Sequence, residues 1–86
     1  MKKIEQFSVV DLFSGCGGLA YGFQCAGFSI AGGIDIDKAA ANTASYNLFW
    51  RYGINHEHLC EDITKRSPDI LKIDQKKKLI VIGGPP

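Results

Sequence analysis

A glycine-rich turn between a short apolar run and a helical pattern is the feature that most constrains this chain of 86 residues. The run at residues 8–13, SVVDLF, has the length and β-branched content of a buried parallel strand. Residues 14–18, SGCGG, carry no bulky side chain. Leu19, Phe23 and Ala26 then recur at helical spacing, and Gly27 stands where a glycine ends a helix. Strand, turn and helix predict the start of a nucleotide-type βαβ unit, whose helix N-terminus offers N–H groups to an anionic ligand group.

Asp11 narrows the class of ligand. Gly15, Gly17 and Ala20 fit the spacing of a dinucleotide fingerprint, and Asp35 follows at the expected separation. However, Asp11 places a carboxylate at the end of the strand, where repulsion from a pyrophosphate would cost on the order of 1 kcal/mol. A ligand with one carboxylate and two cationic centres, such as S-adenosylmethionine, suits the position better. The alternative is that Asp11 faces solvent or caps the turn.

Residues 11–19, DLFSGCGGL, resemble the D-L-F-x-G-x-G-G cofactor motif of the cytosine-5 DNA methyltransferases. The resemblance extends over nearly the whole chain to residues 83–86, GGPP. It implies an α/β, Rossmann-like S-adenosylmethionine-dependent methyltransferase fold, with parallel strands in the order 3-2-1-4. Residues 1–86 would be the N-terminal portion of the catalytic domain, without the target-recognition region. No catalytic residue is then expected in this chain, because in the family the nucleophilic cysteine follows directly after Pro86.

The resemblance also implies roles for individual side chains at the cofactor. Phe13 would pack on the adenine, and Asp35 would hold the ribose, with Ile36 supplying apolar contact where the family often has an aromatic ring. The Asp62 carboxylate would accept from the adenine amine, and the Ile63 N–H would meet a ring nitrogen; the alternative for Asp62 is a helix cap or a solvent-facing acid. The predicted cofactor-binding residues are Asp11, Phe13, Ser14, Gly15, Cys16, Gly17, Gly18, Leu19, Asp35, Ile36, Asp62, Ile63, Gly84 and Pro86.

The function that the resemblance implies is transfer of a methyl group to carbon 5 of cytosine in DNA, with S-adenosyl-L-methionine as cofactor. We expect a bacterial restriction–modification setting, a cytoplasmic location and no activity from the 86 residues alone. A tRNA cytosine-5 methyltransferase of the same family remains an alternative. An NAD-dependent oxidoreductase half-domain and a non-catalytic regulatory subunit or scaffold are further alternatives.

The net charge and the cysteines limit which partners and which cellular compartment we expect. A formal net charge of +1 is not the basic footprint of a nucleic-acid-binding domain, so DNA contacts are expected through parts of the parent protein that these residues do not include. No apolar run is long enough for a membrane helix, and no signal peptide is expected. Three cysteines without C-x-x-C spacing suit a reducing compartment. On a strand His56, His58 and Cys60 would share one face that suits zinc, but no fourth ligand stands out, so no metal site is predicted.

The remaining chain predicts two helices and a fourth strand. Asp37 is a good cap for a helix over residues 38–48. Trp50 and Tyr52 are expected to cover the end of the sheet, and the alternative is that they form an interaction patch. Residues 68–73 read as a short helix with Ser67 as its cap. The apolar strand at residues 79–82 would have an unpaired edge, which predicts self-association or a completing chain along it.

Overall fold

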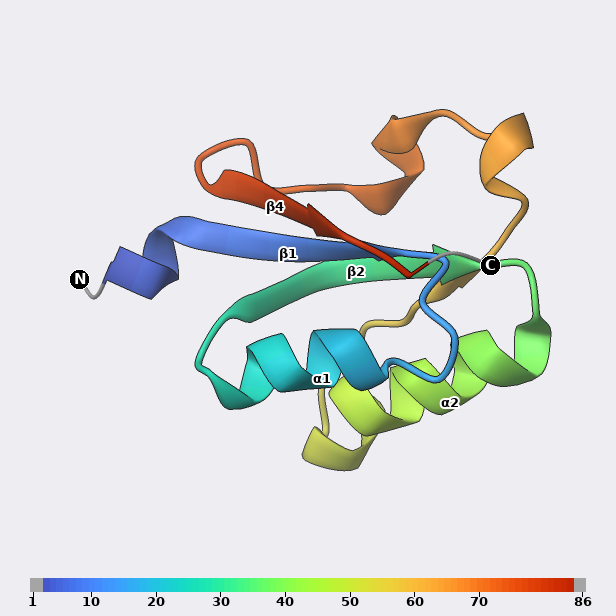
Figure 1. Cartoon of the computed structure of the whole chain (residues 1–86), viewed down its shortest axis with the longest axis horizontal. Helices are drawn as coiled ribbons and strands as arrows, with labels where there is room; N and C mark the ends of the chain where they lie inside the picture. Colours follow the sequence, from blue (N-terminus) through green and yellow to red (C-terminus); the bar gives the residue numbers. More distant parts are fainter. Residues whose placement is uncertain (1–2, 85–86) are drawn as a thin grey trace.

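A four-stranded parallel sheet forms the centre of the molecule. The computed structural model describes residues 3–84, and its strands lie in the order β3-β2-β1-β4 (Figure 1). All three strand pairs are parallel, so the carboxyl ends of the four strands lie at the same end of the sheet. The predicted α/β class and strand order are confirmed. The strands are β1 (Phe7–Leu12), β2 (Ser29–Asp35), β3 (Leu59–Cys60) and β4 (Lys78–Ile82).

Two helices cover one face of the sheet. Figure 1 shows α1 (Gly18–Cys25) and α2 (Lys38–Leu48) on the same side of the strands, with the segment between β3 and β4 on the other side. The second face is thinly covered, because that segment contains only two 3-10 turns, η3 (Ile63–Lys65) and η4 (Pro68–Leu71). The core therefore lies under the helices, and its residues are Ala20, Ala44, Leu48 and Phe49, with Ile30 and Ile82 packed against them.

Both helix boundaries predicted from capping residues are confirmed. Gly27 has a φ of 99°, and the N–H of Phe28 donates to the carbonyl oxygen of Phe23 at 3.1 Å, which ends α1 in a Schellman motif. At the start of α2, the Asp37 carboxylate accepts a hydrogen bond of 3.0 Å from the N–H of Ala39. Local chemistry thus sets the C-terminal end of α1 and the N-terminal end of α2. No helix among residues 3–84 is long and apolar enough to cross a membrane.

Two local predictions are wrong. Trp50 and Tyr52 are about half exposed instead of covering the sheet, because Phe49 leaves the helical conformation at φ −131° and takes the buried position itself. The helix predicted at residues 68–73 is the shorter 3-10 turn η4, and Ser67 caps it without a side-chain hydrogen bond. Lys72, in the left-handed region at φ 52°, ends that turn.

A β-bulge interrupts β2 beside β1. Val9 pairs with Ile30 and Val10 with Gly32, so Ala31 is the extra residue. The Ala31 carbonyl oxygen lies 2.7 Å from Nε2 of His56, which supplies a partner for this carbonyl. Next to the bulge, Gly33 leaves space for the imidazole of His58. Residues that precede β3 are therefore anchored on β2.

Candidate functional site

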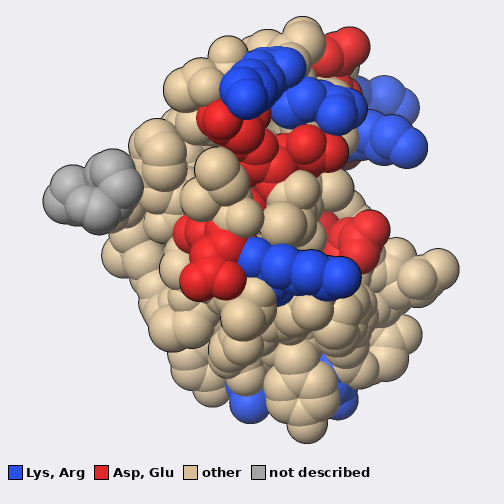
Figure 2. Space-filling view, turned by 90° about the vertical axis from the view of Figure 1, so that its right-hand side faces the viewer, with Lys and Arg blue, Asp and Glu red and all other residues tan. Residues whose placement is uncertain are grey.

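A cleft of about 420 Å³ opens at the carboxyl ends of β1, β2 and β3. Figure 2 looks onto this edge of the molecule and shows Asp and Glu side chains gathered across the middle of the face. This position is where ligands bind in open parallel sheets. The cleft combines apolar walls with carboxylates, and its lining residues are Phe13, Gly15, Ile34, Asp35, Ile36, Glu61, Asp62, Ile63 and Thr64.

Phe13 has an unusual backbone conformation for an aromatic residue. Its φ is 56°, in the left-handed region, and its side chain is 45% exposed although phenylalanine normally lies in the core. A bulky residue held there costs roughly 1–2 kcal/mol relative to an ordinary conformation. The result is a ring at the mouth of the cleft, which also borders a neighbouring hollow of about 360 Å³ that contains Gly84. Strain at an exposed aromatic side chain is typical of a functional position.

Asp35 connects two segments at the end of β2. Its Oδ2 accepts from the N–H of Gly15 at 2.8 Å, and its Oδ1 accepts from the N–H of Asp37 at 2.8 Å. One carboxylate therefore holds both the glycine turn and the start of α2. Each carboxylate oxygen can accept a second hydrogen bond, so Asp35 still has acceptor capacity for hydroxyl groups of a ligand.

Asp62 forms the opposite wall of the cleft. Its Oδ1 accepts from the N–H of Thr64 at 2.9 Å and from Oγ1 of Thr64 at 2.7 Å, and this capping geometry begins η3. These bonds lower the pKa of Asp62 below its usual value, so the group is ionised at neutral pH. Asp62 therefore caps η3, as the helix-cap alternative predicted. Since both bonds end on Oδ1, the cap does not use Oδ2.

The glycine turn is shaped by packing as well as by its place near the cleft. Gly15 and Gly17 have φ values of 55° and 89°. A Cβ atom on Gly17 would lie 3.0 Å from the Cβ of Ala44, so Gly17 allows α2 to approach closely. The N–H of Ser14 donates to the carbonyl oxygen of Ile34 at 3.2 Å, which joins the turn to β2.

A separate hollow of about 240 Å³ lies on the far side of this turn. It is lined by Cys16, Gly17 and Gly18 together with residues of the helices. Arg51, in the 3-10 turn η2 (Trp50–Tyr52) that follows α2, also lines this hollow, and its guanidinium carbon lies 5.1 Å from the centroid of the Tyr21 ring. Of the turn residues predicted to bind the cofactor, Gly15 therefore lines the cleft, whereas Cys16, Gly17 and Gly18 line this separate hollow.

Asp11 is buried instead of lining the cleft. Its side chain is 1% exposed on the helix-covered side of β1, and its Oδ2 has no hydrogen-bond partner among the described residues. Burial raises the pKa of Asp11 to about 6, with a smaller contribution from the charge of Asp35, while the backbone N–H of Ala20 acts in the opposite direction. The alternative that Asp11 faces solvent is wrong.

The comparisons with known proteins agree with the geometry. The family model for C-5 cytosine-specific DNA methylase matches residues 7–86. This chain belongs to that family. The chain is 58% identical over 87 residues to the putative type II methyltransferase M.OihORF3336P of Oceanobacillus iheyensis, covering 99% of this chain and 18% of that protein. It is 39% identical over 79 residues to the type II methyltransferase M.DdeI of Desulfomicrobium norvegicum, covering 92% of this chain and 18% of that protein.

A third relative gives the same result. The type II methyltransferase M.HindV of Haemophilus influenzae is 39% identical over 84 residues, covering 90% of this chain and 23% of the relative. The chain thus spans about a fifth of the length of these relatives. No solved structure matches.

Within this C-5 cytosine-specific DNA methylase chain, the predicted cofactor residues are only partly brought together. Phe13, Gly15, Asp35, Ile36, Asp62 and Ile63 share the cleft. Gly84 lies in the adjoining hollow, Cys16, Gly17 and Gly18 lie across the turn, and Leu19 is exposed on α1. Ser14 and Asp11 are buried, and Pro86 lies outside the described residues.

Two polar residues that line the methylase cleft, Glu61 and Thr64, were not among the predicted cofactor residues. Thr64 bonds to the Asp62 carboxylate and lines the cleft. A threonine two residues after an aspartate is a known local hydrogen-bonding pattern, and this signal was available in the sequence. His56 and His58 instead pack edge-on or tilted against Phe49, with ring centroids 4.8 and 5.7 Å away. Within residues 3–84 no three His, Cys, Asp or Glu side chains form a metal-binding group.

Proposed function

We propose that this chain is the cofactor-binding part of a DNA (cytosine-5-)-methyltransferase and that the cleft binds the adenosyl group of S-adenosyl-L-methionine. The observation that carries the proposal is the convergence of Phe13, Ile36 and Ile63 with the carboxylates of Asp35 and Asp62 in one cleft. A flat aromatic ligand group fits between apolar side chains, and carboxylates accept from hydroxyl and amino groups. The volume of about 420 Å³ is in the range of small-molecule sites.

The hydrogen bonds already present favour a nucleoside over a plain apolar ligand. Asp35 is fixed by two backbone N–H groups, so its remaining acceptor positions are directed without further ordering. In our proposal these positions accept from the two ribose hydroxyls. Asp62 is ionised and oriented by Thr64, and it accepts from the adenine amine. The N–H of Ile63 donates to a ring nitrogen of the adenine.

The buried charge of Asp11 supports a cationic ligand group. An ionised carboxylate without a full set of partners is costly in a buried site. Asp11 does not itself line the cleft, but the charge of Asp35, which does, raises the pKa of Asp11, so a positive charge of a ligand beside Asp35 would act on Asp11 in the opposite direction and offset part of that cost. S-adenosylmethionine carries an ammonium and a sulfonium, whereas a dinucleotide would bring a second set of negative charges. This difference disfavours the NAD-dependent oxidoreductase alternative.

We further propose cytosine-5 methylation of DNA in a bacterial restriction–modification system as the activity of the parent protein, located in the cytoplasm. The type II methyltransferase names of the relatives support this setting. In the parent protein, DNA contacts would come mainly from parts outside these residues, since the chain carries a formal net charge of only +1. The bound cofactor supplies the methyl group, and the side chains described above orient it.

Calorimetry with the 86-residue chain tests the cofactor proposal. S-adenosylhomocysteine is expected to bind and NAD is not. Asp35→Ala should weaken S-adenosylhomocysteine by about 1.5–3 kcal/mol, or roughly tenfold to 150-fold, as expected for hydrogen bonds to a charged acceptor. Asp69→Ala, an exposed acid on η4, serves as the control and should leave the affinity unchanged.

Asp35 also accepts a hydrogen bond from Gly15, so Asp35→Ala could weaken binding by displacing the turn instead of by removing a contact with the ribose. A second ligand distinguishes these two effects. An analogue of S-adenosylhomocysteine that lacks both ribose hydroxyls completes a double-mutant cycle. If Asp35 contacts the ribose, Asp35→Ala has little further effect on the analogue. Equal losses for both ligands would contradict the ribose assignment, and tighter binding of NAD than of S-adenosylhomocysteine would contradict the proposed cofactor.

A further inference from the structure

Thr64 fixes the carboxylate of Asp62 in the wall of the cleft. The backbone N–H of Thr64 donates to Oδ1 of Asp62 at 2.9 Å, and the Thr64 hydroxyl group donates to the same atom at 2.7 Å. The χ2 torsion of an aspartate is otherwise broad, so a carboxylate without such bonds samples many orientations. Two donors on one oxygen therefore set the plane of the group and leave the second oxygen for a ligand.

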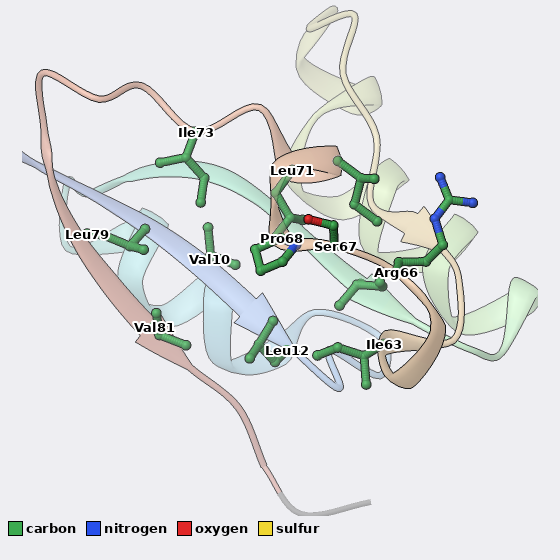
Figure 3. A pocket seen from close by; sticks show the side chains of 12 residues that line it. Val10, Leu12, Ile63, Arg66, Ser67, Pro68, Leu71, Ile73, Leu79 and Val81 are labelled. Carbon is green, nitrogen blue, oxygen red and sulfur yellow. The ribbon is translucent and has the colours of Figure 1, made fainter.

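Other contacts hold the turn η3 in place independently of these two bonds. Ile63 borders the cleft and also an apolar groove of about 280 Å³ on the second face of the sheet, where Figure 3 shows it beside Leu12 at the end of β1. An ion pair of 3.2 Å between Glu61 and Arg66 spans the turn. Loss of the Thr64 hydroxyl group should therefore change the direction of the carboxylate more than the path of the chain.

We propose that Thr64 is a positioning residue that makes the cleft selective for a purine with an amino group at ring position 6. This inference rests on the cofactor proposed above, in which Asp62 accepts from the adenine amine. The second oxygen of a fixed carboxylate accepts this bond with little further loss of side-chain freedom. A purine with hydrogen at position 6 offers no donor to that oxygen, so the site discriminates by the amino group.

The variant Asp62→Asn reveals the orientation, because the two terminal atoms of an asparagine differ. The backbone N–H of Thr64 can only donate, so it selects the amide oxygen of the new side chain. The amide NH2 then takes the place of Oδ2 and faces the adenine amine, which is also a donor. An amide that turned freely would offer its oxygen to the amine instead. Asp62→Asn should therefore lose the preference for the amino group, although an asparagine can accept a hydrogen bond.

Calorimetry of the 86-residue chain with two ligands measures this preference. The ligands are S-adenosylhomocysteine and its analogue with hydrogen in place of the 6-amino group, which keeps the ring nitrogens. Wild type should bind S-adenosylhomocysteine about tenfold more tightly, the low end for a bond to a charged acceptor, because Asp62 is partly exposed. Thr64→Val removes the hydroxyl group at nearly constant shape and should lower this ratio by about threefold. Thr64→Ser keeps the hydroxyl group and should keep the ratio.

The ratio of the two affinities distinguishes positioning from a purely structural role. A cap that only stabilised η3 would, when lost, weaken both ligands equally and leave the ratio unchanged. A wild-type ratio in Thr64→Val, or a retained preference for the amino group in Asp62→Asn, overturns the inference. Equal binding of both ligands by wild type also overturns it but leaves the proposed cofactor standing, whereas no binding of S-adenosylhomocysteine by wild type overturns both. Asp69→Ala, on η4, is the control and should keep the wild-type ratio.

Discussion

Two buried titratable side chains are expected to oppose each other in the pH dependence of stability. Asp11 on β1 and His58 before β3 are 1% and 3% exposed, and both lie on the helix-covered side of the sheet. Burial raises the pKa of Asp11 to about 6. Burial, with a smaller contribution from the charge of His56, lowers the pKa of His58 to about 4, against the influence of Asp35. Both ring nitrogens of His58 lack partners among the described residues.

The signs of the two effects follow from proton binding. Between the ordinary His pKa of 6.5 and about 4, native His58 binds fewer protons than the unfolded chain, so stability falls as the pH falls. Between about 6 and the ordinary Asp pKa of 3.8, native Asp11 binds protons more readily than the unfolded chain, so stability rises as the pH falls. Between about pH 7 and about pH 4.5 each group changes the free energy of unfolding by roughly 2 kcal/mol, and because the two changes have opposite signs they nearly cancel.

Urea denaturation at these two pH values checks the cancellation. Wild type should change little, because its two contributions offset each other. In Asp11→Asn only the His58 effect is left, so the free energy of unfolding should fall by about 2 kcal/mol on acidification. In His58→Leu only the Asp11 effect is left, so the free energy of unfolding should rise by about 2 kcal/mol. The urea midpoints of the two variants should therefore move by about 1–2 M in opposite directions. The double variant should again show a flat profile. The reasoning is refuted if both single variants keep the wild-type pH profile.

Two further predictions concern glycine positions and the cleft. Gly33→Ala should destabilise the fold by about 2 kcal/mol or more in thermal melts, because its Cβ collides with the imidazole of His58, whereas Gly22→Ala, in open space on α1, should stabilise it by about 0.5–1 kcal/mol. Equal effects of the two substitutions would contradict this packing. Thr64→Ala should raise the pKa of Asp62 in an NMR titration, because it removes the hydroxyl bond that contributes most to lowering this pKa and keeps the backbone bond; an unchanged pKa would show that the hydroxyl bond does not persist in solution.

The sequence predicted those parts of the fold that depend on local chemistry. The glycine at the end of α1 and the aspartate at the start of α2 act within one turn of chain, so their residue types are sufficient evidence. The strand order was also predicted correctly, from the family resemblance and the preference for right-handed crossovers. Because this order places β1, β2 and β3 side by side, it also predicts that the acidic and apolar residues at their carboxyl ends lie in one cleft.

Features that depend on tertiary contacts could not be predicted in the same way. The left-handed conformation of Phe13 and the burial of Phe49 in place of Trp50 depend on how the chain turns after β1 and α2. The bonds from Asp35 to Gly15 and Asp37 require the final positions of three segments. A carboxylate at the end of a strand can face a ligand or its own backbone, and the sequence does not distinguish the two.

The two backbone bonds of Asp35 have a consequence for how quickly a ligand can be captured. A glycine-rich loop that became ordered only around its ligand would lose conformational entropy at the moment of binding. Here the carboxylate fixes Gly15 and the start of α2 in the folded chain. The entropy of ordering the turn is therefore lost during folding. The cofactor of the proposed function would then meet a preorganised rim, and its association rate would be limited by diffusion and orientation instead of by loop closure.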